Sequence, residues 1–142
     1  MKDFEYLDSV APSDCAFKAY GATLEGLFAN AARAVTGCMV EAESVGKSEE
    51  HEIELKAKSL SDLLYSLLEE IIYLKDSEGV FLVDFELDIS ISEEYLLKAK
   101  ASGEKIDYKK QEIYADVKAV TMHRFDLRET ADGWEAFVVL DL

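Results

Sequence analysis

The chain has 142 residues, 49% of them hydrophobic and 32% charged, which is typical of one globular domain with a buried core, here residues 1–142. Its 30 acidic and 15 basic residues give a net charge of −15, which repels phosphate groups and argues against direct RNA or DNA binding. The same charge favours cations and basic protein partners, or serves solubility alone. Because no signal peptide opens the chain and no apolar run approaches the ~18 residues of a membrane span, we expect a soluble, cytoplasmic protein.

The first part of the chain predicts two short strands and a helix. Residues 4–7 and 17–20 suit extended structure, whereas residues 11–14 carry the only proline and are predicted to be irregular. Thr23 suits the N-cap of a helix that we expect to end at Gly37. Its apolar residues recur at helical spacing and are Leu24, Leu27, Phe28, Ala31 and Val35.

A surface loop, a strand and a second helix are predicted next. Residues 41–50 are acidic and polar, as in a loop, and residues 52–58 alternate between apolar and charged, as in a half-buried strand. Ser59 and Asp62 resemble a capping pair for the second helix. Its broad apolar face is expected to lie in the core and comprises Leu60, Leu63, Leu64, Leu67, Leu68, Ile71 and Ile72.

The remainder of the chain predicts strands. Alternating segments cover residues 81–91, 97–101, 112–123, 125–128 and 134–141, with a break at 102–104 and a turn at Asp132-Gly133. Two helices among many alternating strands indicate an α+β fold, in which two helices pack on a largely antiparallel β-sheet.

The sequence lacks the motifs and residue spacings of the common catalytic sites. Cys15 and Cys38 form no C-x-x-C pair and are expected to be reduced, packed thiols. The histidines, His51 and His123, lack a second histidine at metal-ligand spacing, and there is no nucleophile elbow or phosphate loop. On its predicted strand, His123 suits a hydrogen-bonded structural role and Lys118 a solvent-facing one. A binding or accessory protein is therefore favoured over an enzyme.

A group of carboxylates is the feature that suggests chemistry. Asp14 falls in the irregular segment, and Asp141 stands beside the terminal carboxylate of Leu142, at the end of a strand that looks packed. Anionic oxygens fixed close together repel each other unless a cation compensates them, and hard oxygen ligands suit Ca²⁺ or Mg²⁺ rather than zinc or copper. A solvated strand end with ordinary surface acids is the alternative interpretation.

Several motifs resemble the archease family over nearly the whole chain. They are Asp14 followed by Phe17-Lys-Ala-Tyr-Gly-Ala-Thr-Leu-Glu-Gly-Leu-Phe28, the helix at 63–70, Gly103-Glu104, Val117-Lys-Ala-Val-Thr-Met-His123 and the closing Val138-Val-Leu-Asp-Leu142. The resemblance implies an accessory protein of the RtcB-type RNA ligase of tRNA splicing. Such a protein accelerates the GTP-dependent guanylylation of the ligase and allows multiple turnover. The alternative is a chaperone-like modulator of other RNA-processing proteins.

The resemblance also implies roles for individual residues. A divalent metal, Ca²⁺ or Mg²⁺, would be bound by Asp14, Asp141 and Leu142, and RNA would be reached only through the ligase. The residues that would contact the partner or its nucleotide are Lys118, His123 and Glu25. One stretch departs from the family pattern: residues 11–16 read Ala-Pro-Ser-Asp-Cys-Ala where the family usually has His-Thr-Ala-Asp followed by Ile-Gly. The missing histidine removes a group that could orient the aspartate or meet the partner.

Overall fold

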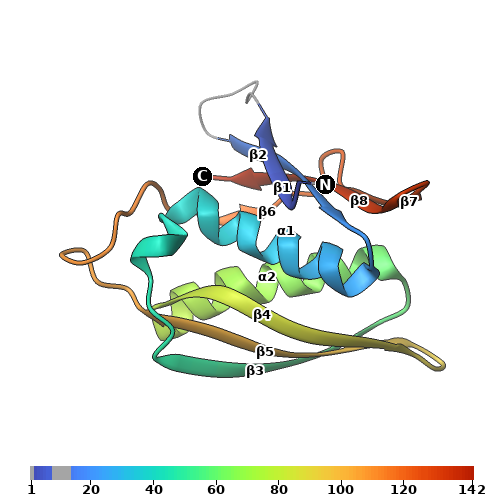
Figure 1. Ribbon diagram of the computed structural model, residues 1–142, viewed down its shortest axis with the longest axis horizontal. Helices are drawn as coiled ribbons and strands as arrows, with labels where there is room; N and C mark the ends of the chain where they lie inside the picture. The colour runs from blue at the N-terminus through green and yellow to red at the C-terminus, as the bar shows by residue number, and fades with distance from the viewer. Residues whose placement is uncertain (1, 8–13) are drawn as a thin grey trace.

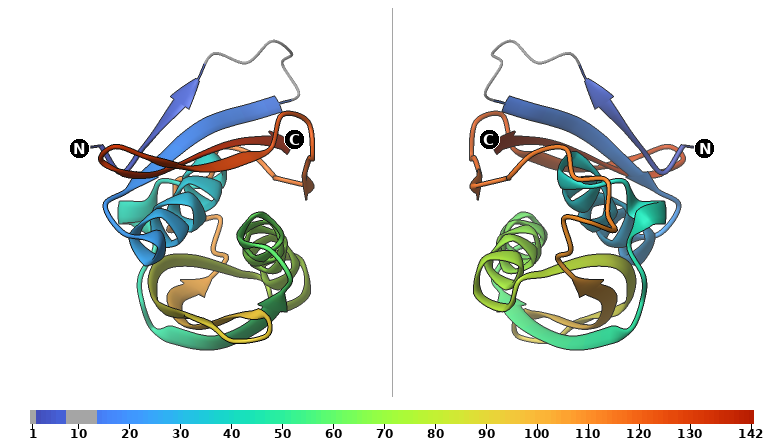
Figure 2. Two further views of the ribbon diagram at one scale, coloured as in Figure 1. Left: turned by 90° about the vertical axis from the view of Figure 1, so that its right-hand side faces the viewer. Right: turned by 90° about the vertical axis from the view of Figure 1, so that its left-hand side faces the viewer.

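The computed structural model describes residues 2–7 and 14–142, and in this part of the chain two helices lie between two antiparallel sheets (Figure 1). The larger sheet contains β1 (Phe4–Leu7), β2 (Asp14–Gly21), β6 (Ala119–Val120), β7 (Asp126–Thr130) and β8 (Gly133–Asp141). The smaller sheet contains β3 (Glu49–Ala57), β4 (Val80–Ile91) and β5 (Tyr95–Lys105). The α+β prediction is confirmed, but both sheets cover the helices, which Figure 2 shows side by side between the layers.

Helix α1 (Leu24–Met39) begins as its sequence predicts and ends later. The hydroxyl of Thr23 accepts a hydrogen bond from the N–H of Gly26 at 3.0 Å, which confirms the N-cap. The predicted end at Gly37 is wrong, because the helix continues to the buried Met39. A Cβ at Gly37 would collide with the hydroxyl of Tyr6, so this glycine allows β1 to approach the helix.

Helix α2 (Leu60–Glu78) has the predicted N-cap and buries its predicted apolar face. The Ser59 hydroxyl accepts a hydrogen bond from the N–H of Asp62 at 3.1 Å, and the helix ends at Gly79, whose φ of 63° is left-handed. Its apolar face is buried except for the half-buried Leu60. Of the helices in the described residues, none is both long enough and apolar enough to cross a membrane.

The predicted break at residues 102–104 is wrong, because β5 continues to Lys105. A Cβ at Gly103 would collide with the backbone carbonyl of Phe81 on β4. The register of β4 against β5 shifts at the same place, between Leu82 and Asp84. Gly103 therefore permits a close approach at a β-bulge and does not end the strand.

The predicted strand at residues 112–123 is also largely wrong. Only β6 forms there, and an irregular segment leads to it from β5 along one side of the molecule (Figure 1). Backbone groups of this segment bind elements other than a neighbouring strand, since the N–H of Tyr114 donates to the carbonyl of Met39 at 2.7 Å. The loop predicted at 41–50 holds a short 3₁₀ helix (Ala42–Ser44) and the start of β3. The strands predicted at 81–91, 125–128 and 134–141 correspond to β4, β7 and β8.

The two cysteines form a disulfide, so the prediction of reduced thiols is wrong. Cys15 on β2 and Cys38 near the end of α1 are 23 residues apart in the chain, and their Cα atoms are 6.8 Å apart. The pairing depends on how β2 crosses α1, which no local spacing reveals. The covalent bond ties the beginning of β2 to the last turn of α1.

Candidate functional site at the end of strand β8

Asp14 and Asp141 lie opposite each other in the sheet. Asp14 is the first residue of β2, and its Cα partner in the antiparallel register is Asp141, the last residue of β8. The prediction of an irregular backbone is therefore wrong at Asp14, while residues 11–13 lie outside the described residues. Directly opposed residues have Cβ atoms about 4.5–5.5 Å apart on one face of the sheet. The register thus brings together two aspartates from opposite ends of the chain, on strands β2 and β8, which run alongside each other in Figure 1.

Lys118 meets the same end of β8 from the other side. Its N–H donates a hydrogen bond to the carbonyl of Asp141 at 2.8 Å, and the next residue, Ala119, is the Cα partner of Asp141. The side chain of Lys118 is exposed, as the solvent-facing prediction requires. The N–H of Thr121 adds a hydrogen bond to the carbonyl of Val139 at 3.0 Å. The end of β8 is therefore held between β2 and β6.

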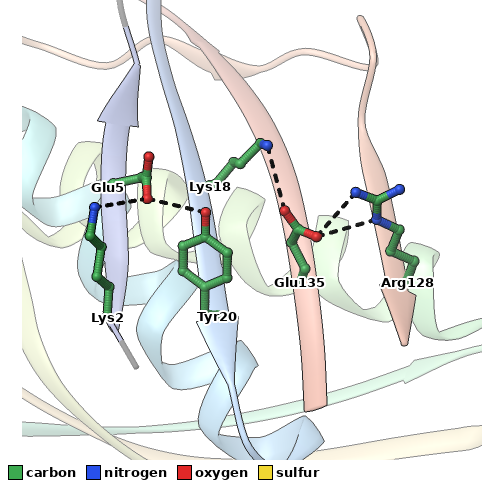
Figure 3. Close-up of polar contacts among 6 residues, drawn as sticks. All are labelled: Lys2, Glu5, Lys18, Tyr20, Arg128 and Glu135. Carbon is green, nitrogen blue, oxygen red and sulfur yellow. Dashed lines mark hydrogen bonds and ion pairs between the residues drawn. The ribbon is translucent and has the colours of Figure 1, made fainter. Parts of the chain in front are cut away.

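Two other carboxylates of this sheet, those of Glu5 and Glu135, are compensated by cations. Polar contacts cross the face of the sheet that the helices do not cover and join Lys2, Glu5, Lys18, Tyr20, Arg128 and Glu135 (Figure 3). Glu135 lies 3.6 Å from the ammonium of Lys18 and 3.1 Å from the guanidinium of Arg128. The hydrogen bond from Lys2 lowers the pKa of Glu5 below its ordinary value. Glu5 and Glu135 thus each lie next to a positively charged side chain.

The pair at the end of the sheet differs from these acids. Within the described residues, no ion pair involves Asp14 or Asp141. The half-buried Leu142 packs its side chain against the core, so its carboxylate stays next to Asp141. Like charges that face each other across two strands are unfavourable unless a cation compensates them. These hard oxygen donors fit Ca²⁺ or Mg²⁺.

The grouping of side chains does not decide whether a metal binds. Over residues 2–7 and 14–142, no three His, Cys, Asp or Glu side chains gather as a metal-binding group. The expected set contains only two such side chains, Asp14 and Asp141, together with the main-chain carboxylate of Leu142. Metal binding by these three residues therefore stays a prediction.

The other expected contact residues are not all at this place. His123 is exposed in a turn between β6 and β7, so the strand position predicted for it is wrong. Glu25 lies half-buried in the first turn of α1. The opposite end of that helix carries Cys38, which is bonded to Cys15, the neighbour of Asp14. At 1.5 Å per residue, Glu25 is about 20 Å along the helix from Cys38, so it lies away from the carboxylate pair.

Two residues of α2 that support this site were missed by the sequence analysis. Lys75 is 6% exposed and donates a hydrogen bond to the carbonyl of Val117, next to Lys118. The hydroxyl of Tyr65 donates to the carbonyl of Val120. The signal for Lys75 was its spacing, because it continues the apolar face of α2 one turn beyond Ile71.

Comparison with known proteins identifies the family. Residues 4–142 match the model of the Archease protein family (MTH1598/TM1083). The chain is 38% identical to protein archease of Methanosarcina barkeri, over 99% of this chain and 97% of that protein. It is 39% identical to protein archease of Pyrococcus abyssi, over the full length of both.

Solved structures agree with this match. The solution structure of Methanobacterium thermoautotrophicum protein 1598 has a TM-score of 0.82 and 32% identity, and covers all of both chains. A crystal structure from Thermotoga maritima, described as an archease and possible chaperone, shares the fold, with a TM-score of 0.61 and 20% identity over 93% of both chains. Neither "archease" nor "possible chaperone" denotes an enzyme, in agreement with the prediction of a non-catalytic protein. The chain belongs to the archease family.

Proposed function

We propose that this protein activates an RtcB-type tRNA-splicing RNA ligase, accelerating the GTP-dependent guanylylation of the ligase and allowing multiple turnover. Membership of the archease family supports the proposal. The structural observation that carries it is the pairing of Asp14 with Asp141 in the β2–β8 register, where neither carboxylate has an ion pair within residues 2–7 and 14–142, and where the N–H of Lys118 binds the carbonyl of Asp141. Two carboxylates and the backbone of a lysine whose side chain is exposed thus meet at the end of β8.

The carboxylates would hold one divalent cation, Ca²⁺ or Mg²⁺. Asp14, Asp141 and the carboxylate of Leu142 supply the oxygen donors, and the strand register sets the spacing of the two aspartates before an ion arrives. A bound cation would offset their mutual repulsion and supply positive charge at the protein surface. Because calcium takes six to eight oxygen ligands, further positions would be left for water or for groups of the partner.

Lys118 would contact the partner or its nucleotide. Its exposed ammonium can meet a phosphate group of GTP or an acidic side chain of the ligase as a compact point charge. The net charge of −15 opposes direct contact with RNA phosphates, so RNA would be reached only through the ligase. His123, exposed in the turn that follows β6, is a further candidate for such a contact.

Two modes of ligase activation are compatible with this site at the end of β8. In the first, the acidic residues present a cation that compensates triphosphate charge at the nucleotide site of the ligase. In the second, the cation only orders the ends of β2 and β8, and the ordered surface favours a ligase conformation competent for guanylylation. The first mode requires the cation to lie next to the nucleotide in the complex, and the second does not.

A ligase assay tests the proposal. Purified ligase, GTP and RNA with a 3′-phosphate end are incubated with and without this protein, and both guanylylation and joined RNA are measured. We expect faster guanylylation and several turnovers per ligase, and neither joining nor hydrolysis by this protein alone. Asp14→Asn and Asp141→Asn should abolish the stimulation, whereas Asp126→Asn removes an exposed carboxylate from the same sheet and should not. Ligase turnover that is unchanged by the parent protein would overturn the proposal.

A chaperone-like modulator of other RNA-processing proteins is the second candidate. It is favoured by the description of the Thermotoga maritima protein as a possible chaperone. Such a protein would reduce the aggregation of RNA-processing enzymes without any effect on guanylylation. Light scattering of a heated client enzyme, measured in parallel with the ligase assay, separates the two functions.

A further inference from the structure

A buried lysine near the C-terminal end of α2 holds the segment that precedes β6. The ammonium of Lys75 donates to the carboxylate of Asp116 at 2.5 Å and to the carbonyl of Val117 at 2.7 Å, and lies 2.7 Å from the carboxylate of Asp76. Lysine is almost never fully buried unless it is paired, and these partners match its three donor hydrogens. Two of the three partners lie more than 40 residues further along the chain. The contact is therefore a tertiary link and not local helix capping.

The charge of Lys75 is maintained despite its burial. Burial by itself lowers the pKa of this ammonium, but the hydrogen bonds to Asp116 and Asp76 outweigh it and raise the pKa above the ordinary value. Both carboxylates are largely exposed, at 67% and 60% of their side-chain surface. Lys75 thus stays a charged donor at every pH near neutrality, and the bond to Val117 does not depend on a titration.

Tyr65 holds the same segment at a second point. Its hydroxyl donates to the carbonyl of Val120 at 3.0 Å, and its ring packs edge-on against Phe125 with centroids 5.5 Å apart. Burial raises the pKa of Tyr65, so the hydroxyl remains protonated and able to donate. Val120 is itself buried, so its carbonyl has little access to water as an alternative partner.

Lys118 lies between these two anchors. Lys75 binds the residue before it and Tyr65 binds a residue shortly after it, while the N–H of Lys118 donates to the carbonyl of Asp141. Residues 114–118 form no strand, so no ladder of backbone hydrogen bonds fixes them. Segments with few such bonds open more readily than core strands. The two side chains of α2 supply the restraint that secondary structure does not.

We propose that Lys75 and Tyr65 are positioning residues. They hold Lys118 against the end of β8, so that the hydrogen bond from its N–H to the carbonyl of Asp141 is maintained when the partner binds. The effect on activity rests on the proposed function, because the activity is ligase stimulation. The effect on geometry can be measured in this protein alone. A failure of the proposed ligase activation can therefore be distinguished from a failure of the positioning role of Lys75 and Tyr65.

Two substitutions remove the anchors with little change of shape. Lys75→Met keeps a long unbranched side chain and removes the donors, and the two carboxylates that lose their partner are largely exposed, so water can solvate them. Tyr65→Phe removes only the hydroxyl. Thr36→Val is the matched control, because it deletes another side-chain bond to a buried backbone carbonyl, from Thr36 to Leu82 at 2.6 Å, between α1 and β4. It does not touch the segment around Lys118.

Amide hydrogen exchange at Lys118 is the geometric readout. We expect exchange there to become roughly five- to tenfold faster in Lys75→Met and in Tyr65→Phe, the order expected when one hydrogen bond to the segment is lost. Exchange at Ala99, in the middle of β5, should stay as in the parent. Ligase stimulation by both variants should fall at temperatures where each is fully folded. In Thr36→Val, the melting temperature should fall while Lys118 exchange and stimulation stay unchanged.

The outcomes separate the two claims. Slow exchange at Lys118 in both α2 variants, equal to that of the parent, would show that the anchors do not position it. Loss of stimulation in Thr36→Val to the same extent would show that the α2 variants act only through general stability. If the parent protein does not stimulate the ligase, the proposed function fails, and the exchange measurement still decides whether Lys75 and Tyr65 position Lys118.

Discussion

Asp14 and Asp141 are Cα partners at the end of the β2–β8 pair, and the N–H of Lys118 binds the carbonyl of Asp141 at the same place. Across the middle of this sheet, Glu135 faces Lys18 and Arg128 (Figure 3). Within the described residues, the aspartate pair has no such ion pair. This contrast on one face of one sheet makes the pair a candidate for binding a cation, and its consequences can be measured.

Calcium should stabilise the parent protein and not its aspartate variants. Binding to the folded state alone contributes about 2.7 kcal/mol at a calcium concentration 100 times the Kd, and EDTA should reverse the rise in melting temperature. Asp14→Asn and Asp141→Asn should each remove the shift. Without calcium, both should be more stable than the parent by about 0.2–1 kcal/mol, because they relieve a cross-strand repulsion. Loss of stability of both variants in EDTA would contradict the proposed repulsion.

The carboxylate of Leu142 can be tested by extending the chain. A few residues added after Leu142 turn this carboxylate into a peptide carbonyl, which carries no net charge and binds calcium less strongly. We expect weaker calcium binding and weaker ligase stimulation, with calorimetric titration as the measurement. A tag at the N-terminus is the control. If the extended chain binds calcium as well as the parent, only the two aspartates remain as ligands.

Lys118→Ala should separate activity from stability. The side chain is exposed, so its removal should change the free energy of unfolding by less than about 0.5 kcal/mol. Ligase stimulation should fall, because the ammonium is the part of the site that would meet a phosphate or an acidic group. Lys98→Ala removes an exposed lysine from the other sheet and should have no effect. Full stimulation by folded Lys118→Ala would show that this lysine is an ordinary exposed side chain with no role in ligase stimulation.

Reduction of the Cys15–Cys38 disulfide should destabilise the fold. Closing a loop of this length restricts the unfolded chain, and its loss should lower the free energy of unfolding by about 2–4 kcal/mol. Urea denaturation with and without a thiol reductant measures the change. The double variant Cys15→Ser/Cys38→Ser should unfold like the reduced parent and be insensitive to reductant. If reductant leaves the parent's midpoint unchanged, the bond does not form in solution.

Truncations on the leucine-rich face of α2 should strongly destabilise the fold. Leu64 and Leu67 are fully buried, so Leu64→Ala or Leu67→Ala should cost about 2–5 kcal/mol of unfolding free energy. Tyr73 lies on the same helix with 61% of its surface exposed, and Tyr73→Ala should cost far less. Equal midpoints for the three variants in urea would show that the helix does not pack as described.

Glu104 should make stability depend on pH in the acid range. Hydrogen bonds from Lys110, the N–H of Gly46 and Gln111 lower the pKa of Glu104 to about 2, below its ordinary value of 4.5. The charged form therefore favours the folded state above pH 4.5, and this stabilisation is lost as the pH falls from 4.5 towards 2. The difference in melting temperature between the parent and Glu104→Gln should shrink over that interval. A difference that stays constant would exclude a lowered pKa.

Local patterns in the sequence were sufficient for much of the fold. The apolar face of α2 and the hydroxyls of Thr23 and Ser59 determine where helices form and begin, because a helix depends on residues three and four positions apart. The alternation in β3 determines which of its side chains are buried, because successive residues in a strand point to opposite faces. The motifs along the chain, from Asp14–Phe28 to the closing Val138–Leu142, were sufficient to indicate the family.

Contacts between residues far apart in the sequence were decided only by the tertiary structure. The register that places Asp14 opposite Asp141, the bond between Cys15 and Cys38, and the burial of Lys75 join parts of the chain with no local relationship. Residues 112–118 alternate like a strand, yet most of them pair with no strand: the N–H groups of Tyr114 and Ala115 bind the carbonyl of Met39 on α1, and Lys75 of α2 binds the carbonyl of Val117. Periodicity indicates which side chains face the core. Each of these contacts also depends on which element packs beside the residues involved, and the packing of the elements is determined only when the whole chain folds.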